Sequence, residues 1–428
     1  MLNTLINAFR EKEIRKKMLM TLLMLLVFRL GCFIPVPGIA AESFQNLAQN
    51  DFFKIISTIT GGSLANGTIF ALGILPFINA FIIMQLLTLV IPPLDRLSKQ
   101  GEAGRKKITQ ITRYAAIVLA IIQAVGICLS WGQDSFDATL ESKALTIALV
   151  IIMLVGGSCM VMWIGDRITE YGVGNGTSLI IFVGILASAG QHLLSAFTTA
   201  GDGDSLAKSI WLIIAFLLVV LFVFVFIIFV DLAERRITIQ YAKQVKGNKM
   251  YGGQSTHIPM KVNASGVMPI IFASSFLMFP QMIASFWPNS AFYQWWSRWL
   301  GIGTPIYIAV MTLLILFFSF FYSQIQFNPE DISRNIQQNG GFIPGIRPGR
   351  PTTDYLKRVN NRITLFGAIF LALVALVTSI VLPAIGTENG LGNAFSATGL
   401  LIVVSVAMEF DTQLQNQLMM KHYKGFLK

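Results

Sequence analysis

The chain has 428 residues, of which 54% are hydrophobic and only 12% are charged, and its formal net charge is +11. Soluble domains usually carry about 25% charged residues, so this composition excludes an ordinary soluble protein. Uncharged apolar runs recur from end to end, and about 20 such residues are enough to cross a bilayer as a helix. The sequence therefore predicts an all-α, polytopic membrane protein.

Ten membrane spans are expected. Basic residues before the first span mimic a signal peptide, but Arg29 interrupts the apolar run and many spans follow, so we interpret it as a retained span. The expected spans cover residues 18–39, 76–94, 114–132, 144–165, 177–197, 209–230, 264–287, 304–326, 363–383 and 394–410.

The basic residues predict the topology of these spans. If both termini are cytoplasmic, 27 of the 32 Lys and Arg residues lie on the cytoplasmic side and 4 lie outside. Cytoplasmic loops of membrane proteins are enriched in Lys and Arg, so the split favours an even number of spans. Five spans on each side of residue 200 predict an N-terminal half at 1–200 and a C-terminal half at 201–428, related by inverted topology.

A glycine-rich half-segment at 61–75 precedes the second span and is separated from it by Pro76. It is too short to cross a bilayer alone. Broken backbone at membrane depth is tolerated only where it is buried in protein or lines a watery cavity. The segment is therefore either the wall or stopper of a path through the membrane, or a re-entrant loop that fills space between helices.

Two long loops, at about 231–263 and 327–362, are basic and rich in turn residues. Their charges could serve only to fix the orientation of the chain. Loops of this length usually carry function, however, and their Gly and Pro residues favour structured loops that dock a partner.

Charged residues are nearly absent from the expected spans, with Arg29 alone in mid-span and Glu409 and Asp411 at the end of the last one. Two interpretations are a passive channel and an ion-coupled transporter of small solutes. Such a transporter usually carries intramembrane carboxylates, so the sequence favours the channel. An intramembrane enzyme would need paired catalytic residues, which the sequence lacks. The histidines and cysteines show no metal-ligand spacing, and no cofactor motif is evident, so we expect no catalytic site, metal or cofactor.

Two pairs of isoleucines, Ile78 with Ile82 and Ile181 with Ile185, are spaced to share one helix face. A ring of such side chains can close a pore by excluding water. Isoleucine at this spacing is also ordinary core or lipid-facing material. Neutral polar residues within the spans are open to two interpretations as well, since they join helices either in static packing or at an interface that reopens.

Six motifs spread over almost the whole chain resemble the SecY family of protein-conducting channels. They are FRLGCFIPVPGI at 28–39, GGSLANGTIFALGILPFINAFIIMQLL at 61–87, ITEYGVGNGTS at 168–178, QSTHIPMKVNASGVMPIIFASS at 254–275, GFIPGIRPG at 341–349 and LLIVVSVAMEF at 400–410. The resemblance implies a clamshell of two pseudo-symmetric five-helix halves around an hourglass pore.

The resemblance also implies roles for individual residues. The pore ring would be Ile78, Ile82, Ile181, Ile185, Ile271 and Ile402. The plug, a loosely packed re-entrant half-helix, would be Gly61, Gly62, Ser63, Leu64, Ala65, Asn66, Gly67, Thr68, Ile69, Phe70, Ala71 and Leu72. A lateral gate between spans two and three and spans seven and eight would have polar contacts from Gln85, Gln123, Asn263, Ser274 and Ser275. Docking of a motor or ribosome would fall to Arg235, Arg236, Lys243, Lys246, Lys249, Arg347 and Arg350.

The function implied by the resemblance is a protein-conducting channel of the general secretory pathway. It would translocate unfolded preproteins across the bacterial plasma (inner) membrane and release membrane proteins laterally into the lipid bilayer. The implied partners are the small membrane subunits SecE and SecG, the SecA motor, the ribosome, and the signal sequences of the substrates.

Overall fold

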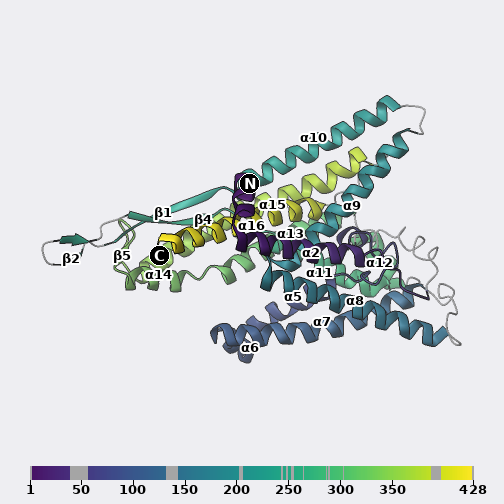
Figure 1. Ribbon diagram of the computed structural model, residues 1–428, viewed down its shortest axis with the longest axis horizontal. Coiled ribbons are helices and arrows are strands. Elements are labelled where there is room, and N and C mark those ends of the chain that lie inside the picture. Colours follow the sequence, from purple (N-terminus) through teal and green to yellow (C-terminus); the bar gives the residue numbers. More distant parts are fainter. Residues whose placement is uncertain are drawn as a thin grey trace.

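A computed structural model describes residues 2–38, 56–131, 143–201, 206–241, 244–246, 249–251, 255–263, 265–285, 287, 290–301, 303–386 and 397–426. Its long helices spread apart from the end of the molecule that carries the β-strands (Figure 1). The helices of the first half of the chain are α1 (Leu2–Arg10), α2 (Lys12–Gly31), α5 (Leu75–Val90), α6 (Pro92–Ser98), α7 (Gly101–Trp131), α8 (Lys143–Tyr171) and α9 (Gly176–Gly201). Those of the second half are α10 (Leu206–Asp231), α11 (Met268–Ser285), α12 (Ala291–Leu300), α13 (Pro305–Gln326), α14 (Pro329–Gln338), α15 (Arg350–Gly386) and α16 (Ala397–Phe426).

Each of the ten expected spans overlaps one of these helices, namely α2, α5, α7, α8, α9, α10, α11, α13, α15 and α16. By length and composition alone, 6 described helical stretches can cross a membrane, or 7 if α5 and α6, which bend by 104° relative to each other, form one span. Three of the ten helices fall outside this set. Charged and polar residues occupy one end of α2 and of α16, and the apolar stretch of α11, Met268–Ala284, is short. The helix α2 of the first expected span ends at Gly31 instead of residue 39, and α16 of the last span continues to Phe426.

The long basic loop at 231–263 folds as a β-hairpin, which the sequence interpretation did not include. Strands β1 (Glu234–Tyr241) and β4 (Ser255–Lys261) pair antiparallel, and β5 (Gly341–Phe342) joins the other edge of β1. Beyond them, β2 (Gln244–Lys246) and β3 (Lys249–Tyr251) form a second ribbon that projects away from the helices (Figure 1).

One face of this sheet is apolar, and that face fixes it to the helices. Ile237 and Ile239 of β1 are buried and alternate with exposed residues, as expected of a half-buried strand. They pack in one cluster with Ile336 of α14 and Leu356 of α15. The predicted all-α architecture therefore holds for the membrane helices, and the sheet is an addition at one end of them.

A buried polar network joins α13 to α15. Asn360 Nδ2 donates to Ser323 Oγ at 2.9 Å, and the hydroxyls of Ser323 and Thr364 are hydrogen-bonded at 2.7 Å. All three residues are buried. Polar side chains in an apolar environment are stable only with such partners, so this network fixes the register of the two helices.

The Ser323→Ala variant should therefore have a lower midpoint of thermal unfolding in detergent, because Asn360 and Thr364 lose their shared partner at a cost of about 1–2 kcal/mol. Ser319→Ala is the matched control. Ser319 is also buried on α13, but its hydroxyl donates to Ile315 O within the same helix. Equal midpoints for the two variants would show that the network adds no stability of its own.

Candidate functional site

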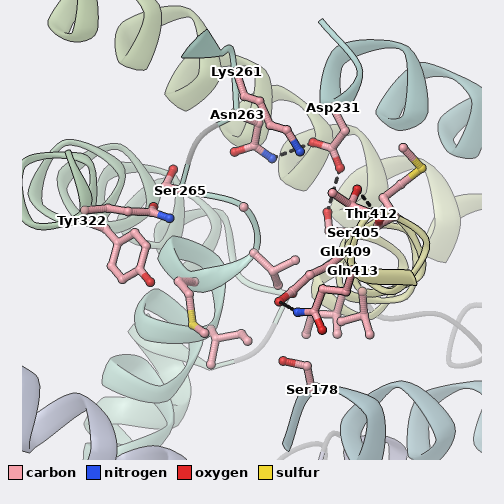
Figure 2. Close-up of a pocket in the computed structure, with 18 of the residues that line it drawn as sticks. Ser178, Asp231, Lys261, Asn263, Ser265, Tyr322, Ser405, Glu409, Thr412 and Gln413 are labelled. Carbon is pink, nitrogen blue, oxygen red and sulfur yellow. Dashed lines mark hydrogen bonds between the residues drawn. The ribbon is translucent and has the colours of Figure 1, made fainter. Parts of the chain in front are cut away.

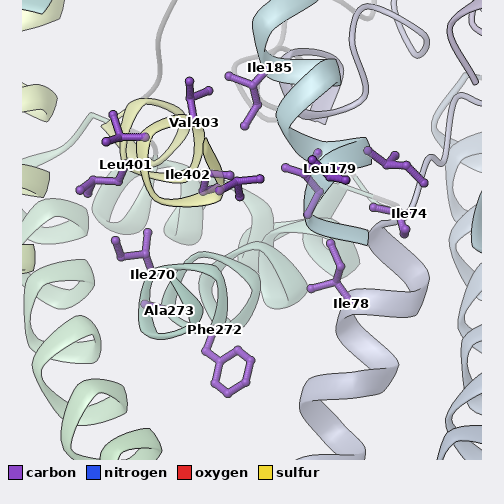
Figure 3. Close-up of a cluster of buried hydrophobic side chains, with 14 of the residues drawn as sticks. Ile74, Ile78, Leu179, Ile185, Ile270, Phe272, Ala273, Leu401, Ile402 and Val403 are labelled. Carbon is purple, nitrogen blue, oxygen red and sulfur yellow. The ribbon is translucent and has the colours of Figure 1, made fainter. Parts of the chain in front are cut away.

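The six isoleucines expected to form a ring meet in one apolar cluster. Five are buried members of this large cluster, and the sixth, Ile271, is partly buried and packs against the cluster. They come from four helices that are distant in the sequence, with Ile78 and Ile82 on α5, Ile181 and Ile185 on α9, Ile271 on α11 and Ile402 on α16. Figure 3 shows Ile78, Ile185 and Ile402 around one apolar region between these helices. We refer to the six residues as the isoleucine cluster.

A cavity of about 440 Å³ lies between the isoleucine cluster and the sheet. Its apolar lining includes Ile181, Ile271 and Ile402, three members of the cluster. The rest of the lining is mainly polar, and Figure 2 shows Asp231, Lys261, Asn263, Ser405 and Glu409 around the space. The cavity therefore combines polar side chains from several elements with an apolar wall to which three members of the isoleucine cluster contribute.

Two of the carboxylates that line the cavity are hydrogen-bonded differently. Asp231 accepts from Asn263 Nδ2 at 2.7 Å and from Ser405 Oγ at 3.2 Å, which joins three different elements. Glu409 accepts from Gln413 Nε2 at 3.1 Å within α16. The side-chain amide of Asn263, expected at the lateral gate, therefore donates to a residue of the C-terminal half of the chain instead of to one across the gate.

The predicted plug differs from the expected half-helix. Residues 60–74 form successive turns, and only residues 56–59 before them are helical. Gly61 and Gly67 have φ angles of 72° and 60°, which side chains with a Cβ rarely adopt. The glycines that mark the segment in the sequence therefore break a helix instead of loosening one.

Residues 58–74, which contain the predicted plug and which we call the plug segment, also pack more tightly than we expected. The exposed fractions of Ser63 and Thr68 are 0% and 1%. Two glycines on neighbouring helices allow this contact, because a Cβ at Gly157 of α8 would overlap Ile69 O and one at Gly184 of α9 would overlap Ile59 O. The rings of Phe70 and Phe28 of α2 stack with centroids 6.0 Å apart.

Arg29, which had no role in the sequence interpretation, holds the plug segment in place. Its Nη1 donates to Gly61 O at 2.7 Å, and its guanidinium carbon lies 4.8 Å from the centre of the Phe33 ring. Ser188 and Ser158 donate to Thr58 O and Gly73 O at the two ends of the segment. A lone arginine within a span must find oxygen acceptors, and that rule was the available signal for this contact.

The helices predicted to form a lateral gate lie in contact. α11 packs against α5, α7 and α16, and Met282 of α11 shares a buried cluster with Ala120 and Ala124 of α7. Gln123 is buried on α7, and the buried Oε1 of Gln85 on α5 has no partner among the described residues. On α11, Ser274 donates to Ile271 O within the helix, and Ser275 is buried.

The residues predicted to dock a partner lie at the sheet end of the molecule. Arg235, Arg347 and Arg350 are exposed, and so is Arg236, whose Nε contacts Glu234 at 2.7 Å. Arg347 lies in the turn between β5 and α15, which Thr352 closes by donating to Arg347 O at 2.8 Å. Lys243 lies outside the described residues, and Lys246 and Lys249 are described by their backbone alone, in β2 and β3. No cluster of three or more His, Cys, Asp or Glu in the described ranges is arranged to hold a metal ion.

Comparisons with known proteins agree with this geometry. The family model SecY matches residues 68–410. A relative from Streptomyces galbus, named protein translocase subunit SecY, is 41% identical over 444 residues, and the match covers 100% of both chains. A solved structure described as a protein conducting channel superposes with a TM-score of 0.70 at 20% identity, covering 95% of this chain and 93% of the other. Sec61 in a canine ribosome-channel complex gives a TM-score of 0.65 at 19% identity with the same coverage.

The close packing of the plug segment makes the Gly157→Val variant informative. Overpacking of this kind costs about 1–3 kcal/mol, so the segment should leave its site more often and expose the thiol of Cys32, which is only 1% exposed. We expect maleimide modification of Cys32, followed by mass spectrometry, to accelerate roughly tenfold.

Gly156→Val is the matched control, because a Cβ at Gly156 meets nothing within 4 Å. Equal rates of Cys32 modification in the two valine variants would contradict the tight seat of the plug segment.

Proposed function

The chain belongs to the SecY family and is a protein-conducting channel rather than an enzyme, and we propose that the cavity, the isoleucine cluster and the plug segment are successive parts of its path. The observation that carries this proposal is the meeting of six isoleucines from four helices at the end of a polar cavity. We propose further that residues 1–200 and 201–428 form the two halves that enclose this path. The contacts of α7 with α8 and of α10 with α15, each within one half, support that division.

The chemistry of the isoleucine cluster suits a channel for polypeptides. A moving chain presents every type of side chain, so a charged or strongly hydrogen-bonding constriction would trap part of it. Aliphatic side chains exclude water from a narrow pore without binding the substrate. The carboxylates of the cavity lie on the sheet side of the constriction, where they leave the aliphatic seal intact.

The plug segment closes the path on the side of α2, α8 and α9. Its buried turns, the Arg29 hydrogen bond and the glycine contacts support a closed resting state. All of these contacts involve helices of the first half of the chain. Its apolar side chains also reach the second half, because Leu64, Ala71 and Leu72 share a buried cluster with Met282 of α11. Opening therefore requires the segment to break polar contacts with the first half and apolar contacts with α11.

The lateral gate lies between two rigid helix pairs in this proposal. α5 packs along α7, and α11 packs along α13, where Phe272 makes edge-to-face contacts with Phe318 at 5.7 Å and Tyr322 at 5.9 Å between ring centroids. Apolar residues such as Met282 contribute the contact between α11 and α7. A hydrophobic signal sequence can replace such contacts, and the Oε1 of Gln85, which has no partner among the described residues, can accept a hydrogen bond from the substrate when the gate opens.

The partners follow from the exposed arginines and from the relatives. Arg235, Arg347 and Arg350 point to docking of the SecA motor or the ribosome at the sheet, and one channel of the same fold is known in a ribosome-channel complex. We propose the small subunits SecE and SecG as further partners, and the bacterial plasma membrane as the location. The excess of Lys and Arg at the sheet end supports cytoplasmic termini.

The seal can be tested with the double variant Ile82→Asn/Ile185→Asn. Amide side chains at the constriction should hold water there, so reconstituted channels should leak small ions at rest. Conductance across planar bilayers is the measurement. Ile82→Val/Ile185→Val, which keeps the constriction aliphatic, should remain closed. A folded Asn variant as tight as wild type would remove these residues from the seal.

Docking can be tested at Arg347. Its forked guanidinium makes contacts that lysine reproduces only in part, so Arg347→Glu should strongly reduce ATP-dependent import into inverted vesicles and Arg347→Lys should be intermediate. Arg334→Glu on α14 is the control, since Arg334 is exposed at the same end of the molecule but outside the proposed docking set. Normal import by the Arg347→Glu variant would exclude Arg347 from docking.

A further inference from the structure

The β1–β4 hairpin is connected in sequence to two helices that line the path. β1 follows directly on α10, whose last residue is Asp231, and β4 leads through Asn263 to α11. The base of the hairpin is closed by Val262 N, which donates to Ala233 O at 2.9 Å. A displacement of the hairpin therefore reaches α10 and α11 first.

One carboxylate joins these connections to a third helix. Asp231 accepts from Asn263 at 2.7 Å and from Ser405 of α16 at 3.2 Å (Figure 2). Ser405 follows Ile402 by three residues and so lies on nearly the same face of α16. On the other side, Asn263 precedes α11, which carries Ile271. Asp231 thus stands between the hairpin and two members of the isoleucine cluster.

The burial of these residues makes the hydrogen bonds to Asp231 costly to break. Asn263 is 7% exposed and Ser405 is 8% exposed, and the Oδ1 of Asn263 has no partner among the described residues. Hydrogen bonds to a carboxylate are shorter and stronger than neutral ones, and a partly buried carboxylate loses much if either donor leaves. Asn263 and Ser405 should therefore follow Asp231 when α10 and the hairpin move.

We propose that Asp231 is a positioning residue that transmits displacement of the β1–β4 hairpin to α11 and α16, and so to the isoleucine cluster. The source of that displacement rests on the docking role given to the hairpin under the proposed function. The mechanical link itself rests on the two hydrogen bonds and stands apart from the identity of any partner.

The first experiment needs no partner. Spin labels are attached at Thr256→Cys on β4 and Phe276→Cys on α11, both exposed positions, in a chain whose Cys32, Cys128 and Cys159 are replaced by serine. Pulsed electron paramagnetic resonance measures the distribution of distances between the labels. Asp231→Asn and Asn263→Leu should each broaden the distribution, since the helix is no longer held to the end of α10.

A swapped pair separates this link from a general loss of stability. In Asp231→Asn/Asn263→Asp the new amide can donate to the new carboxylate and still accept from Ser405, at unchanged total charge. The swapped pair should restore the narrow distribution. Asp411→Asn is the control for the chemical change, because the hydrogen bond that Asp411 accepts from Gln415 lies within α16.

The second experiment uses the complete channel in inverted vesicles. Asp231→Asn and Asn263→Leu should lower the rate of ATP-dependent import about three- to tenfold, the range set by the loss of one or two such hydrogen bonds, while binding of the SecA motor changes less than about twofold. The swapped pair should recover import. A purely structural role would instead lower the amount of folded channel, and with it binding and import together.

The proposal is overturned if both single variants keep the wild-type distance distribution and import rate. It is also overturned if the swapped pair restores neither the narrow distribution nor the import rate. Failure of the docking role has a different signature. If Arg347→Glu and Arg235→Glu leave motor binding and import intact, the hairpin is not the docking surface, yet the distance measurement still decides whether Asp231 positions α11.

Discussion

The structure depends on hydrogen-bond partners for the irregular backbone of the plug segment, which lies between the membrane helices. Most of residues 60–74 are buried in turns instead of a regular helix, and the carbonyl groups that the turns leave unpaired need donors that lipid cannot supply. Arg29, Ser158 and Ser188 supply donors from α2, α8 and α9, while small residues on these helices let the turns approach closely. These helices are thereby held around the segment, and α5 begins directly after it with Ile78 and Ile82 directed to the isoleucine cluster.

This constraint explains which features were predictable. Spans and isoleucine pairs follow from composition and helical spacing, since they depend on residues within one element, and each expected span overlaps a helix. That the pairs on α5 and α9 meet Ile271 and Ile402 depends on packing between distant segments, and it came from the resemblance to a family. The turn conformation of the plug segment and its close packing were not foreseen, because glycines in a sequence indicate a flexible segment as readily as a close contact between segments.

The same distinction accounts for what the sequence interpretation missed. Arg29 looked isolated because its acceptor, Gly61 O, is a backbone atom and leaves no trace in composition. The gate role of Asn263 came from the resemblance and stays a prediction, but its hydrogen bond to Asp231 across the base of a hairpin was not foreseen. That hairpin was read as a loop because its alternating pattern, clear over residues 234–241, is short and surrounded by basic and turn residues. Each of these omissions concerns a partner supplied by another element.

The small sheet has an open side with its own consequence. In the described part of the chain, β4 pairs with β1 on one side and with no strand on the other. An exposed edge invites a further strand, but Pro259 offers no amide hydrogen and Lys261 places a charge at the end of the strand. Backbone addition is therefore disfavoured, and this end of the channel presents itself to other molecules through side chains. A partner that docks at this edge, as proposed above, would therefore bind and leave without adding a strand of its own to the sheet.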